Sequence, residues 1–420
     1  WASGDYSVSK SIDEYQQMYQ PYLPGEYREV GRPTRVTALY DDLKQKGAIY
    51  GDLFGWERPK FFAPKGLNEI YGFRRTNVFN IIGEECRAVR ESVGIADLSS
   101  FAKYEVRGPD AQRLLERVCA NRLPRRDGDV GLSQMLTTLG GIECEVTVTR
   151  FTEEHYYLIS GAVAELHDLD WLVQHVTPGE DLAITNVTDD YGVLVLAGPK
   201  SRDVLSALSD TDLTNEGGFT WMRAKEIKVA GIPVRALRVS YVGELGWELH
   251  CKMDMLKSLH DAVISAGQAY NIRHFGTYAL NALRMEKGYK AWGSELTTEI
   301  SPVEADMRRF IREEGGYIGA AVVQRKEKDG VPLHLVYCQV EADDADPMGN
   351  EPVYEGNDII GITTSGAYGH CVKKSLIFAY VQSGFESPGT FFEVGILGKR
   401  RKAIVLAEPA WDPGNTRLKA

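Results

Sequence analysis

A glutamate between two glycines is the residue of this chain whose setting best suits the binding of a polar ligand. Residues 238–249 read as an apolar strand, a tight Gly-Glu-x-Gly turn that contains Glu244, and a second, alternating strand. The turn is expected to fix the Glu244 carboxylate at the rim of a sheet, beside Tyr241. A fixed carboxylate beside aromatic side chains suits a flat heterocycle that presents two adjacent N–H donors. The same pattern also fits an ordinary hairpin with a surface glutamate.

A second segment with a recognisable pattern follows further along the chain. Residues 279–289 predict a helix that buries its leucines and ends at Gly288. An arginine, Arg284, lies in this helix. The helix is followed by Trp-Gly-Ser-Glu-Leu at 292–296 and by Ser-Pro at 301–302.

Together these segments resemble the folate-binding aminomethyltransferase family, whose type member is the T-protein of the glycine cleavage system. That family carries the patterns Tyr-x-Gly-Glu-x-Gly, Leu-Arg-x-Glu-x-Gly, Gly-x-(Asp/Glu)-Leu and Ser-Pro, which occur here in the same order. Two continuations, Glu-Lys-Gly-Tyr at 286–289 and Trp-Gly at 292–293, are more similar to the C-terminal half of dimethylglycine and sarcosine dehydrogenases. The resemblance covers about residues 30–415.

The resemblance implies that the chain binds tetrahydrofolate, and it implies a role for each matching residue. Glu244 would bind the pterin ring, and Arg284 would hold a carboxylate of the folate tail or an acidic partner. The alternative for Arg284 is a helix-surface arginine that pairs with an acid such as Glu286. The alternative for the aromatic residues is plain core packing. The folate-binding residues implied by the resemblance are Glu244, Tyr241, Arg284, Phe101 and Trp292.

The strand predicted at residues 140–148 departs from the family at its catalytic position. Its sequence, Gly-Gly-Ile-Glu-Cys-Glu-Val-Thr-Val, resembles a family strand with two adjacent aspartates, which are replaced here by Cys144 and Glu145. The resemblance implies that Glu145 is catalytic and takes the amine proton during carbon transfer. The side chain of glutamate reaches about 1 Å further than that of aspartate. The alternative is an exposed acid on an alternating strand.

The composition of the 420 residues is that of an ordinary globular enzyme, with 43% hydrophobic and 25% charged residues. A net charge of −11 argues against a nucleic-acid partner, and no apolar run is long enough to span a membrane. No secretory signal is recognised at the start. The six cysteines include no Cys-x-x-Cys pair, which predicts a reducing compartment. The eight histidines include no His-x-x-x-His, so no metal site is expected.

Three regions are expected along the chain. Residues 1–75 form an aromatic-rich, irregular N-terminal extension or linker, residues 76–325 the folate-binding body, and residues 331–420 a small antiparallel β-barrel. A charged loop at 325–330 is expected to mark the last boundary. Within the body, Gly-Pro at 108–109 and again at 198–199 ends a strand and begins a helix. This internal repeat predicts a pseudo-symmetric α+β fold around a central site.

The expected function is tetrahydrofolate-dependent transfer of a methyl or methylene group from an N-methylated amine, its iminium or an onium donor. No Gly-x-Gly-x-x-Gly motif follows a strand, so the sequence predicts no FAD or NAD site. Oxidation of the amine is therefore assigned to a flavoprotein partner or to an absent N-terminal flavin half. The family's Ala-Arg-Asp is Ala-Leu-Asn at 279–281, which argues against a true T-protein.

The alternative from another functional class is a non-catalytic regulatory or scaffolding protein with the same fold. The replacement of an acid by Cys144 supports this alternative. The expected location is the cytoplasm if the source is bacterial, and the mitochondrial matrix if it is eukaryotic.

Overall fold

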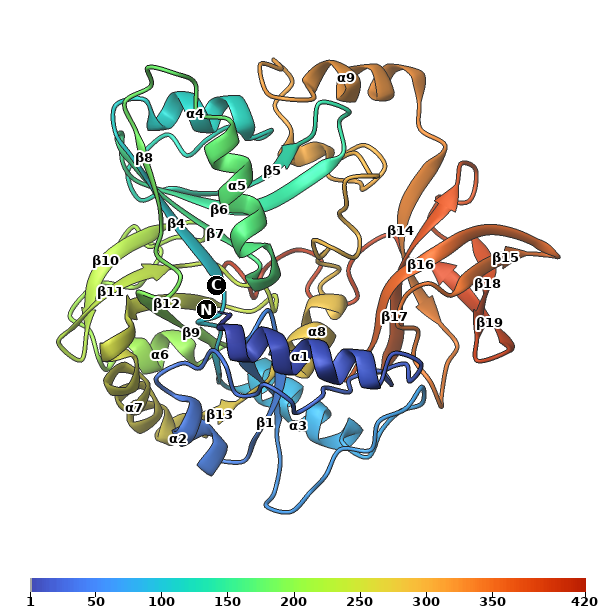
Figure 1. The fold of residues 1–420 in the computed structure, drawn as a ribbon, viewed down its shortest axis with the longest axis horizontal. Helices are drawn as coiled ribbons and strands as arrows, with labels where there is room; N and C mark the ends of the chain where they lie inside the picture. Colours follow the sequence, from blue (N-terminus) through green and yellow to red (C-terminus); the bar gives the residue numbers. More distant parts are fainter. Residues whose placement is uncertain (1) are drawn as a thin grey trace.

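The computed structural model describes residues 2–420, whose strands form two larger sheets, a separate hairpin and a closed barrel (Figure 1). The two larger sheets and their helices make up the body of the molecule, and the barrel lies beside them. The predicted α+β fold with a small C-terminal antiparallel barrel is confirmed.

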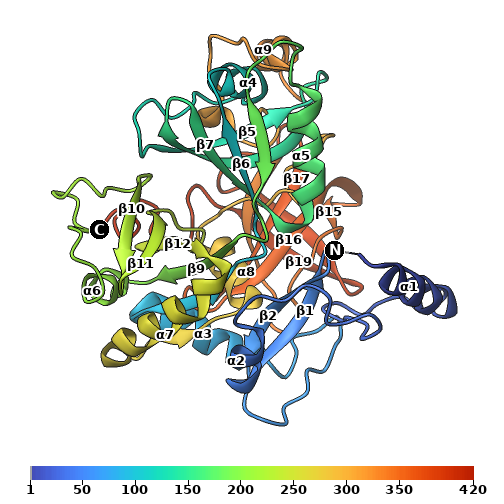
Figure 2. The ribbon, with the colours of Figure 1, turned by 60° about the vertical axis from the view of Figure 1, so that its left-hand side comes forward.

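The N-terminal region contains more regular structure than the sequence predicts. Its elements are α1 (Gly4–Gln16), α2 (Tyr40–Gln45), β1 (Ala48–Leu53), β2 (Trp56–Phe62) and α3 (Phe79–Glu91). β1 and β2 form an antiparallel hairpin within a stretch that was expected to be irregular. Phe54 and Gly55 close it with positive φ values of 54° and 79°, which reverse the chain in a tight turn. Figure 2 shows α1 at the side of the molecule, apart from the two sheets.

The body is built from a five-stranded sheet with the order β5-β6-β7-β4-β8 and a six-stranded sheet with the order β10-β11-β12-β9-β3-β13. The first half of the body contains β3 (Gly94–Asp97), β4 (Ala102–Arg107), α4 (Ala111–Val118), β5 (Val130–Leu136), β6 (Ile142–Thr152), β7 (His155–Ser160), η1 (Ala162–Ala164) and α5 (Glu165–Gln174). The second half contains β8 (Ala183–Asn186), β9 (Tyr191–Ala197), α6 (Ser201–Ser206), β10 (Ala224–Val229), β11 (Ile232–Leu237), β12 (Gly246–Lys252), η2 (Met253–Met255), α7 (Leu256–Gly267), η3 (Gln268–Tyr270) and β13 (Arg273–His274).

The predicted internal repeat is confirmed. β4 leads through Gly108 into α4, and β9 leads through Gly198 into α6. Both glycines adopt positive φ values, 125° and 130°, that other residues rarely take. A Cβ atom on Gly108 would lie 2.5 Å from the carbonyl oxygen of Asp181, and one on Gly198 would lie 2.6 Å from that of Val89. The two turns are therefore restricted to glycine by backbone conformation and by close packing.

Each larger sheet contains the strand that leads into the other sheet. β3 precedes β4 in the chain but pairs with β9, whereas β8 precedes β9 but pairs with β4. Matching hydrogen bonds fix the two crossings. The Val193 amide donates to the Ser99 hydroxyl oxygen at 2.9 Å, and the Lys103 amide donates to the Thr188 hydroxyl oxygen at 3.0 Å. The repeat thus interlocks the halves of the body, which the sequence alone does not reveal.

Helix α8 (Thr277–Glu286) confirms the predicted helix, and Gly288 follows it with a φ of 66°. The elements η4 (Arg308–Phe310) and α9 (Ala320–Asp329) then lead toward the barrel. The prediction of a charged loop at 325–330 is wrong, because α9 extends through most of it. α9 buries Ala320 and Val323, so its charged residues are the solvent-facing side of an amphipathic helix.

The barrel closes in the strand order β14-β17-β16-β15-β18-β19. Its strands are β14 (Leu333–Val340), β15 (Pro352–Glu355), β16 (Asp358–Gly369), β17 (Lys374–Gln382), β18 (Phe391–Ile396) and β19 (Lys399–Val405). The short strand β15 was not predicted, because only Val353 among its residues is fully buried and no alternation is visible. None of the described helices is both long and apolar enough to cross a bilayer.

The close packing of the Gly-Pro turns predicts a stability effect. We expect Gly198→Ala to lower the free energy of unfolding by about 3 kcal/mol, since it adds left-handed strain to a steric clash. Gly231→Ala is the matched control, because Gly231 has a φ of 81° but open space around a Cβ. It should cost only about 1 kcal/mol. Urea unfolding followed by tryptophan fluorescence measures both, and equal losses would contradict the packing argument.

A buried histidine pair predicts a pH dependence. His260 of α7 and His274 of β13 approach with their Nε2 atoms 2.9 Å apart. Burial, then the charges of His260 and Lys46, lowers the pKa of His274 to about 3. Below about pH 6.5 the unfolded state therefore binds a proton that the folded state does not bind, so the free energy of unfolding decreases as the pH falls. By pH 5 we expect a loss of about 2 kcal/mol from His274.

The variant His274→Gln isolates this contribution. Unfolding by urea at a series of pH values between about 7 and 5 should show a shallower loss of stability for the variant than for the unchanged chain. Parallel pH profiles of the two proteins would exclude His274 as the source.

Candidate functional site

Glu145 lies at the centre of the candidate site, on the face of β6 opposite Cys144. Cys144 packs in the apolar core of the first sheet, so the strand's alternation turns Glu145 to the other side. Its Oε1 accepts a hydrogen bond from Gln134 Nε2 at 2.9 Å. Burial raises the pKa of Glu145 to about 7, although part of the side chain remains accessible to solvent. The Glu145 carboxylate is enclosed by protein but partly accessible to solvent, and we call the accessible space beside it the hollow.

Residues from the second half of the body complete the surroundings of Glu145. Burial is the largest cause of the raised pKa of Glu145. The charge of Lys290 lowers this pKa, and the charge of Glu295 raises it. Burial raises the pKa of Tyr241, and Glu145 raises it further. The Tyr241 hydroxyl donates to the Lys290 carbonyl at 2.9 Å, and its ring stacks on Tyr289 at 5.9 Å between centroids. The site therefore forms where β6 meets the connection between β11 and β12 and the segment after α8.

The predicted ligand arginine, Arg284, is buried and already paired. It is 4% exposed and donates to Glu295 at 3.1 Å, to Asn281 at 2.9 Å and to the Tyr289 carbonyl at 3.0 Å. The alternative of an arginine paired with an acid fits these contacts, but the acid is Glu295, and the side chain is not on the surface. Its predicted contact with a ligand carboxylate stays a prediction.

Two aromatic side chains named by the sequence lie at the edges of the same region. Trp292 donates from Nε1 to the Glu143 carbonyl at 2.8 Å, which ties it to β6 close to Glu145. Phe101 packs against the apolar cluster that Tyr241 also joins, and against a second cluster between the sheets. The structure thus brings together Glu145, Tyr241, Arg284 and Trp292, and it places Phe101 against the apolar cluster that Tyr241 joins.

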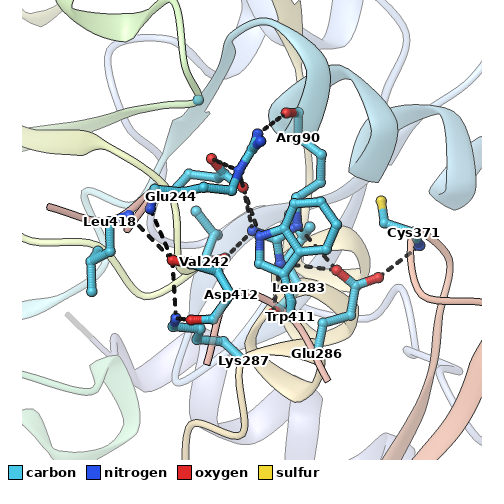
Figure 3. A network of polar contacts seen from close by, with 12 residues as sticks. Arg90, Val242, Glu244, Leu283, Glu286, Lys287, Cys371, Trp411, Asp412 and Leu418 are labelled. Atoms are coloured by element: carbon cyan, nitrogen blue, oxygen red, sulfur yellow. Dashed lines mark hydrogen bonds and ion pairs between the residues drawn. The ribbon is translucent and has the colours of Figure 1, made fainter. Parts of the chain in front are cut away.

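Glu244, the sixth, occupies a different environment (Figure 3). Its carboxylate accepts hydrogen bonds from Arg90 at 3.1 Å, from Trp411 Nε1 at 2.8 Å and from Arg417 Nε at 2.9 Å. The residue is 1% exposed, so the alternative of a surface glutamate is wrong. The predicted tight turn is also wrong, because β11 ends at Leu237 and an irregular connection spans 238–245.

Arg90 is the centre of this second environment. Its guanidinium also pairs with Glu286 at 2.9 Å, and the other oxygen of Glu286 accepts from the Cys371 amide at 2.7 Å. Cys371 belongs to the barrel domain, and Trp411 to the segment that follows the barrel. We call residues 407–420 the C-terminal segment. The network therefore joins α3, α8, the barrel and the C-terminal segment through buried charges (Figure 3).

Glu248 belongs to the same motif as Glu244 but was not singled out from the sequence. In β12, Trp247 and Leu249 enter the apolar core, so Glu248 and His250 occupy the opposite face. An oxygen of the Glu248 carboxylate lies 3.3 Å from His250 Nε2, and the Glu248 side chain is 13% exposed. The alternation of apolar and polar residues in 246–252 was the signal that would have drawn attention to it.

Two buried acceptors near the site lack a hydrogen-bond partner among the described residues: Gln134 Oε1 and Ser240 Oγ. Gln134 contacts Glu145, and Ser240 precedes Tyr241, so both belong to the lining of the hollow. Unpaired buried polar atoms are uncommon in folded proteins, and they suit a region built to meet a polar ligand.

Two clefts on the outside of the molecule involve other residues. One, of about 610 Å³, is lined by residues 70–77 and Leu397. The other, of about 430 Å³, is rich in arginine and includes Arg122, Arg125 and Arg312. Neither includes a residue of the Glu145 group, and the candidate site is chosen on the chemistry of the side chains around Glu145.

Two family models match the chain. The model described as GCVT N-terminal domain matches residues 39–314, and the model described as glycine cleavage T-protein C-terminal barrel domain matches residues 334–412. The second match lies within the closed barrel and the start of the C-terminal segment.

Curated relatives and a solved structure agree with these matches. The chain is 39% identical to human mitochondrial dimethylglycine dehydrogenase over all of its own length and 49% of that protein. It is 31% identical to the mouse pyruvate dehydrogenase phosphatase regulatory subunit, over 89% of the chain and 44% of that protein. The chain therefore spans about half the length of these curated relatives.

The crystal structure of glycine cleavage system aminomethyltransferase T from Bartonella henselae superimposes with a TM-score of 0.78. The match covers 90% of this chain and 99% of that one, at 20% identity. At this level of identity the likeness establishes the fold.

The Glu244 network predicts a large cost of removing one charge. Glu244→Gln should lower the free energy of unfolding by about 3 kcal/mol, because it leaves the two arginines Arg90 and Arg417 with Glu286 as their remaining buried acid. Glu314→Gln is the control, since the Arg122–Glu314 pair is more than half exposed on both sides. That variant should change stability by less than about 1 kcal/mol. Comparable urea midpoints for the two variants would refute the role assigned to Glu244.

Proposed function

Because the chain belongs to the family of the glycine cleavage T-protein, we propose that it transfers a one-carbon unit to tetrahydrofolate in the hollow around Glu145. The observation that carries the proposal is the enclosed carboxylate of Glu145 with Tyr241 and Trp292 beside it, and with Phe101 on the apolar cluster that Tyr241 joins. An acid beside aromatic rings matches a flat, polar heterocycle that must exchange protons.

The lining of the hollow fits a folate. The pterin ring carries several N–H donors, and the unpaired acceptors Gln134 Oε1 and Ser240 Oγ are suited to receive them. Phe101, Tyr241 and Trp292 offer aromatic faces for its ring. When bound, tetrahydrofolate supplies the amine nitrogens that take up the one-carbon unit.

We assign proton transfer to Glu145. An amine that forms a new C–N bond must release its N–H proton, and a carboxylate held by Gln134 and enclosed by protein is positioned to accept it. The proton then leaves with the demethylated amine. Lys290, whose charge acts on Glu145, favours the ionised form that this step needs.

Recognition of the pterin ring by Glu244 stays a prediction, and the geometry sets a condition for it. Both Glu244 oxygens accept hydrogen bonds from Arg417, so a ligand would gain access only if the C-terminal segment withdrew. Glu248 requires no such movement, since its contact with His250 at 3.3 Å does not involve the C-terminal segment. We therefore propose Glu248 as the carboxylate that serves the ring when the C-terminal segment is in place.

The donor that best suits this proposal is an N-methylated amine or its iminium. A relative at 39% identity is named as a dimethylglycine dehydrogenase, and the chain corresponds to about half of it. We propose that this chain provides the folate-side component of a demethylating system. A flavoprotein partner, or a flavin-binding half of a longer protein, would oxidise the amine.

A non-catalytic regulatory role is the second candidate. It is favoured by the likeness to a protein named as a regulatory subunit and by the replacement of an acid at Cys144. Under this alternative the hollow would bind folate or nothing, and no carbon transfer would occur.

Calorimetric titration with tetrahydrofolate tests the proposal. The unchanged chain should bind it, and Glu248→Gln should weaken binding by a factor of about 10–100, because a charged hydrogen bond contributes about 1.5–3 kcal/mol. Glu145→Gln should bind with similar affinity but lose transfer from a methylated amine by about 100-fold or more. Product analysis by mass spectrometry distinguishes methyl- from methylene-tetrahydrofolate.

Two comparisons sharpen this experiment. Glu226→Gln alters an acid whose side chain is 69% exposed, and it should change neither binding nor transfer. If Glu244→Gln weakens binding more than Glu248→Gln in folded protein, the family-based prediction for Glu244 holds instead. A chain that binds no tetrahydrofolate refutes the transferase proposal, and binding without transfer from any donor tested favours the regulatory alternative.

A further inference from the structure

A cysteine, a histidine and an aspartate meet behind the strand that carries Glu145. Cys144 comes from β6, and His167 and Asp168 come from the first turn of α5. One potential ligand atom from each of the three residues lies within 4.8 Å of the others. Residues 2–420 contain no second group of this kind. The cluster is separate from the hollow, because Cys144 and Glu145 occupy opposite faces of β6.

The cluster contains a buried oxygen that nothing satisfies. Cys144 and Asp168 are both 0% exposed. Asp168 Oδ1 contacts His167 Nδ1 at 2.9 Å, but Asp168 Oδ2 is buried without a hydrogen-bond partner. A buried carboxylate oxygen without a partner is unfavourable, and a bound cation would satisfy it.

The histidine of the cluster is oriented as metal-bound histidines usually are. While His167 Nδ1 faces Asp168, its Nε2 lies 2.9 Å from Glu143 Oε1. A carboxylate on the far ring nitrogen fixes the tautomer of a ligating imidazole and its direction. Glu143 is thus placed to hold the proton on Nε2 and to leave Nδ1 free to coordinate. The Trp292 ring, 5.5 Å from the imidazole between centroids, covers one side of it.

We propose that Cys144, His167 and Asp168 bind a zinc ion, with Glu143 as the positioning residue for His167. A thiolate, an imidazole and a carboxylate are the three ligand types that zinc takes in proteins. On binding, a bond forms between zinc and the Cys144 sulfur, the S–H bond breaks, and the proton passes to solvent. No oxidation state changes. Water supplies the fourth, tetrahedral position.

This site was not expected from the sequence, since the histidines show no metal-binding spacing. Its ligands come from a strand and from a helix that lies after β7, so only the packing of α5 on the first sheet brings them together. Cys144 is also the residue that departs from the family's acid. A role as a zinc ligand explains why a cysteine stands at this position. Zinc binding by Cys144 does not depend on whether the hollow binds folate.

Metal analysis of the full chain tests the proposal. After chelator treatment and dialysis against zinc, plasma mass spectrometry should find about one zinc per chain. Cobalt in place of zinc should give a thiolate-to-cobalt charge-transfer band and the intense visible bands of tetrahedral coordination. Cys144→Ala should abolish the charge-transfer band and weaken zinc binding by about 100-fold or more, and Glu143→Gln should weaken it by about 10–100-fold.

Cys251→Ala is the matched control, because Cys251 is also buried, at 1% exposure, but belongs to the core of the second sheet. Its zinc affinity should equal that of the unchanged chain. Circular dichroism establishes that each variant is folded before it is compared. The cobalt spectrum of the unchanged chain gives a test that needs no variant. A missing charge-transfer band, or zinc binding that Cys144→Ala leaves intact, would overturn the proposal.

Discussion

The exchange of strands between the two sheets is the constraint on which the rest of the body depends. At each crossing, a main-chain amide donates to a carbonyl of the other half: Leu98 to Val193 at 3.0 Å, and Val187 to Lys103 at 2.9 Å. The hydroxyls of Ser99 and Thr188 return a bond at the same places. Because each half supplies a strand to the other, neither sheet is complete alone. Side chains from both halves therefore keep a fixed separation around Glu145.

The crossing also explains a lysine in an unusual place. Lys103 is 0% exposed, and its ammonium group donates to the carbonyls of Ser99 at 2.7 Å and Phe101 at 2.8 Å. Burial lowers its pKa to about 7. The bend between β3 and β4 leaves these carbonyls without strand partners, and a long side chain satisfies them from within. Phe101 is consequently held at the edge of the hollow by the same contact that closes the crossing.

Local patterns predicted the local structure. The leucine spacing of 279–289 and Gly288 gave helix α8 and its end, because helical period and a left-handed glycine are properties of a few consecutive residues. The repeated Gly-Pro turns were found for the same reason. The strand exchange was not predictable, since the residues of a short apolar strand do not specify which other strand it pairs with.

The candidate site divides in the same way. Glu145, Tyr241, Phe101 and Trp292 were all named from the resemblance of their segments to known ones, and the fold brings Tyr241 and Trp292 close to Glu145. The surroundings of Glu244 were missed because its partners Trp411 and Arg417 lie 167 and 173 residues away in the chain. A motif of six residues contains no information on contacts at that range. Arg284 pairs with an acid, as one alternative had it, but the acid is Glu295, because Glu286 pairs with Arg90.

The C-terminal segment has a consequence for how the chain is made on the ribosome. Arg90 and Glu244 are synthesised early, but Trp411 and Arg417, which complete their hydrogen bonds, emerge only after the whole barrel has been translated. Until then the body carries an incompletely neutralised charge group in its interior. The C-terminal segment thus completes the hydrogen bonds of a charge group whose first member, Arg90, lies 327 residues before Arg417.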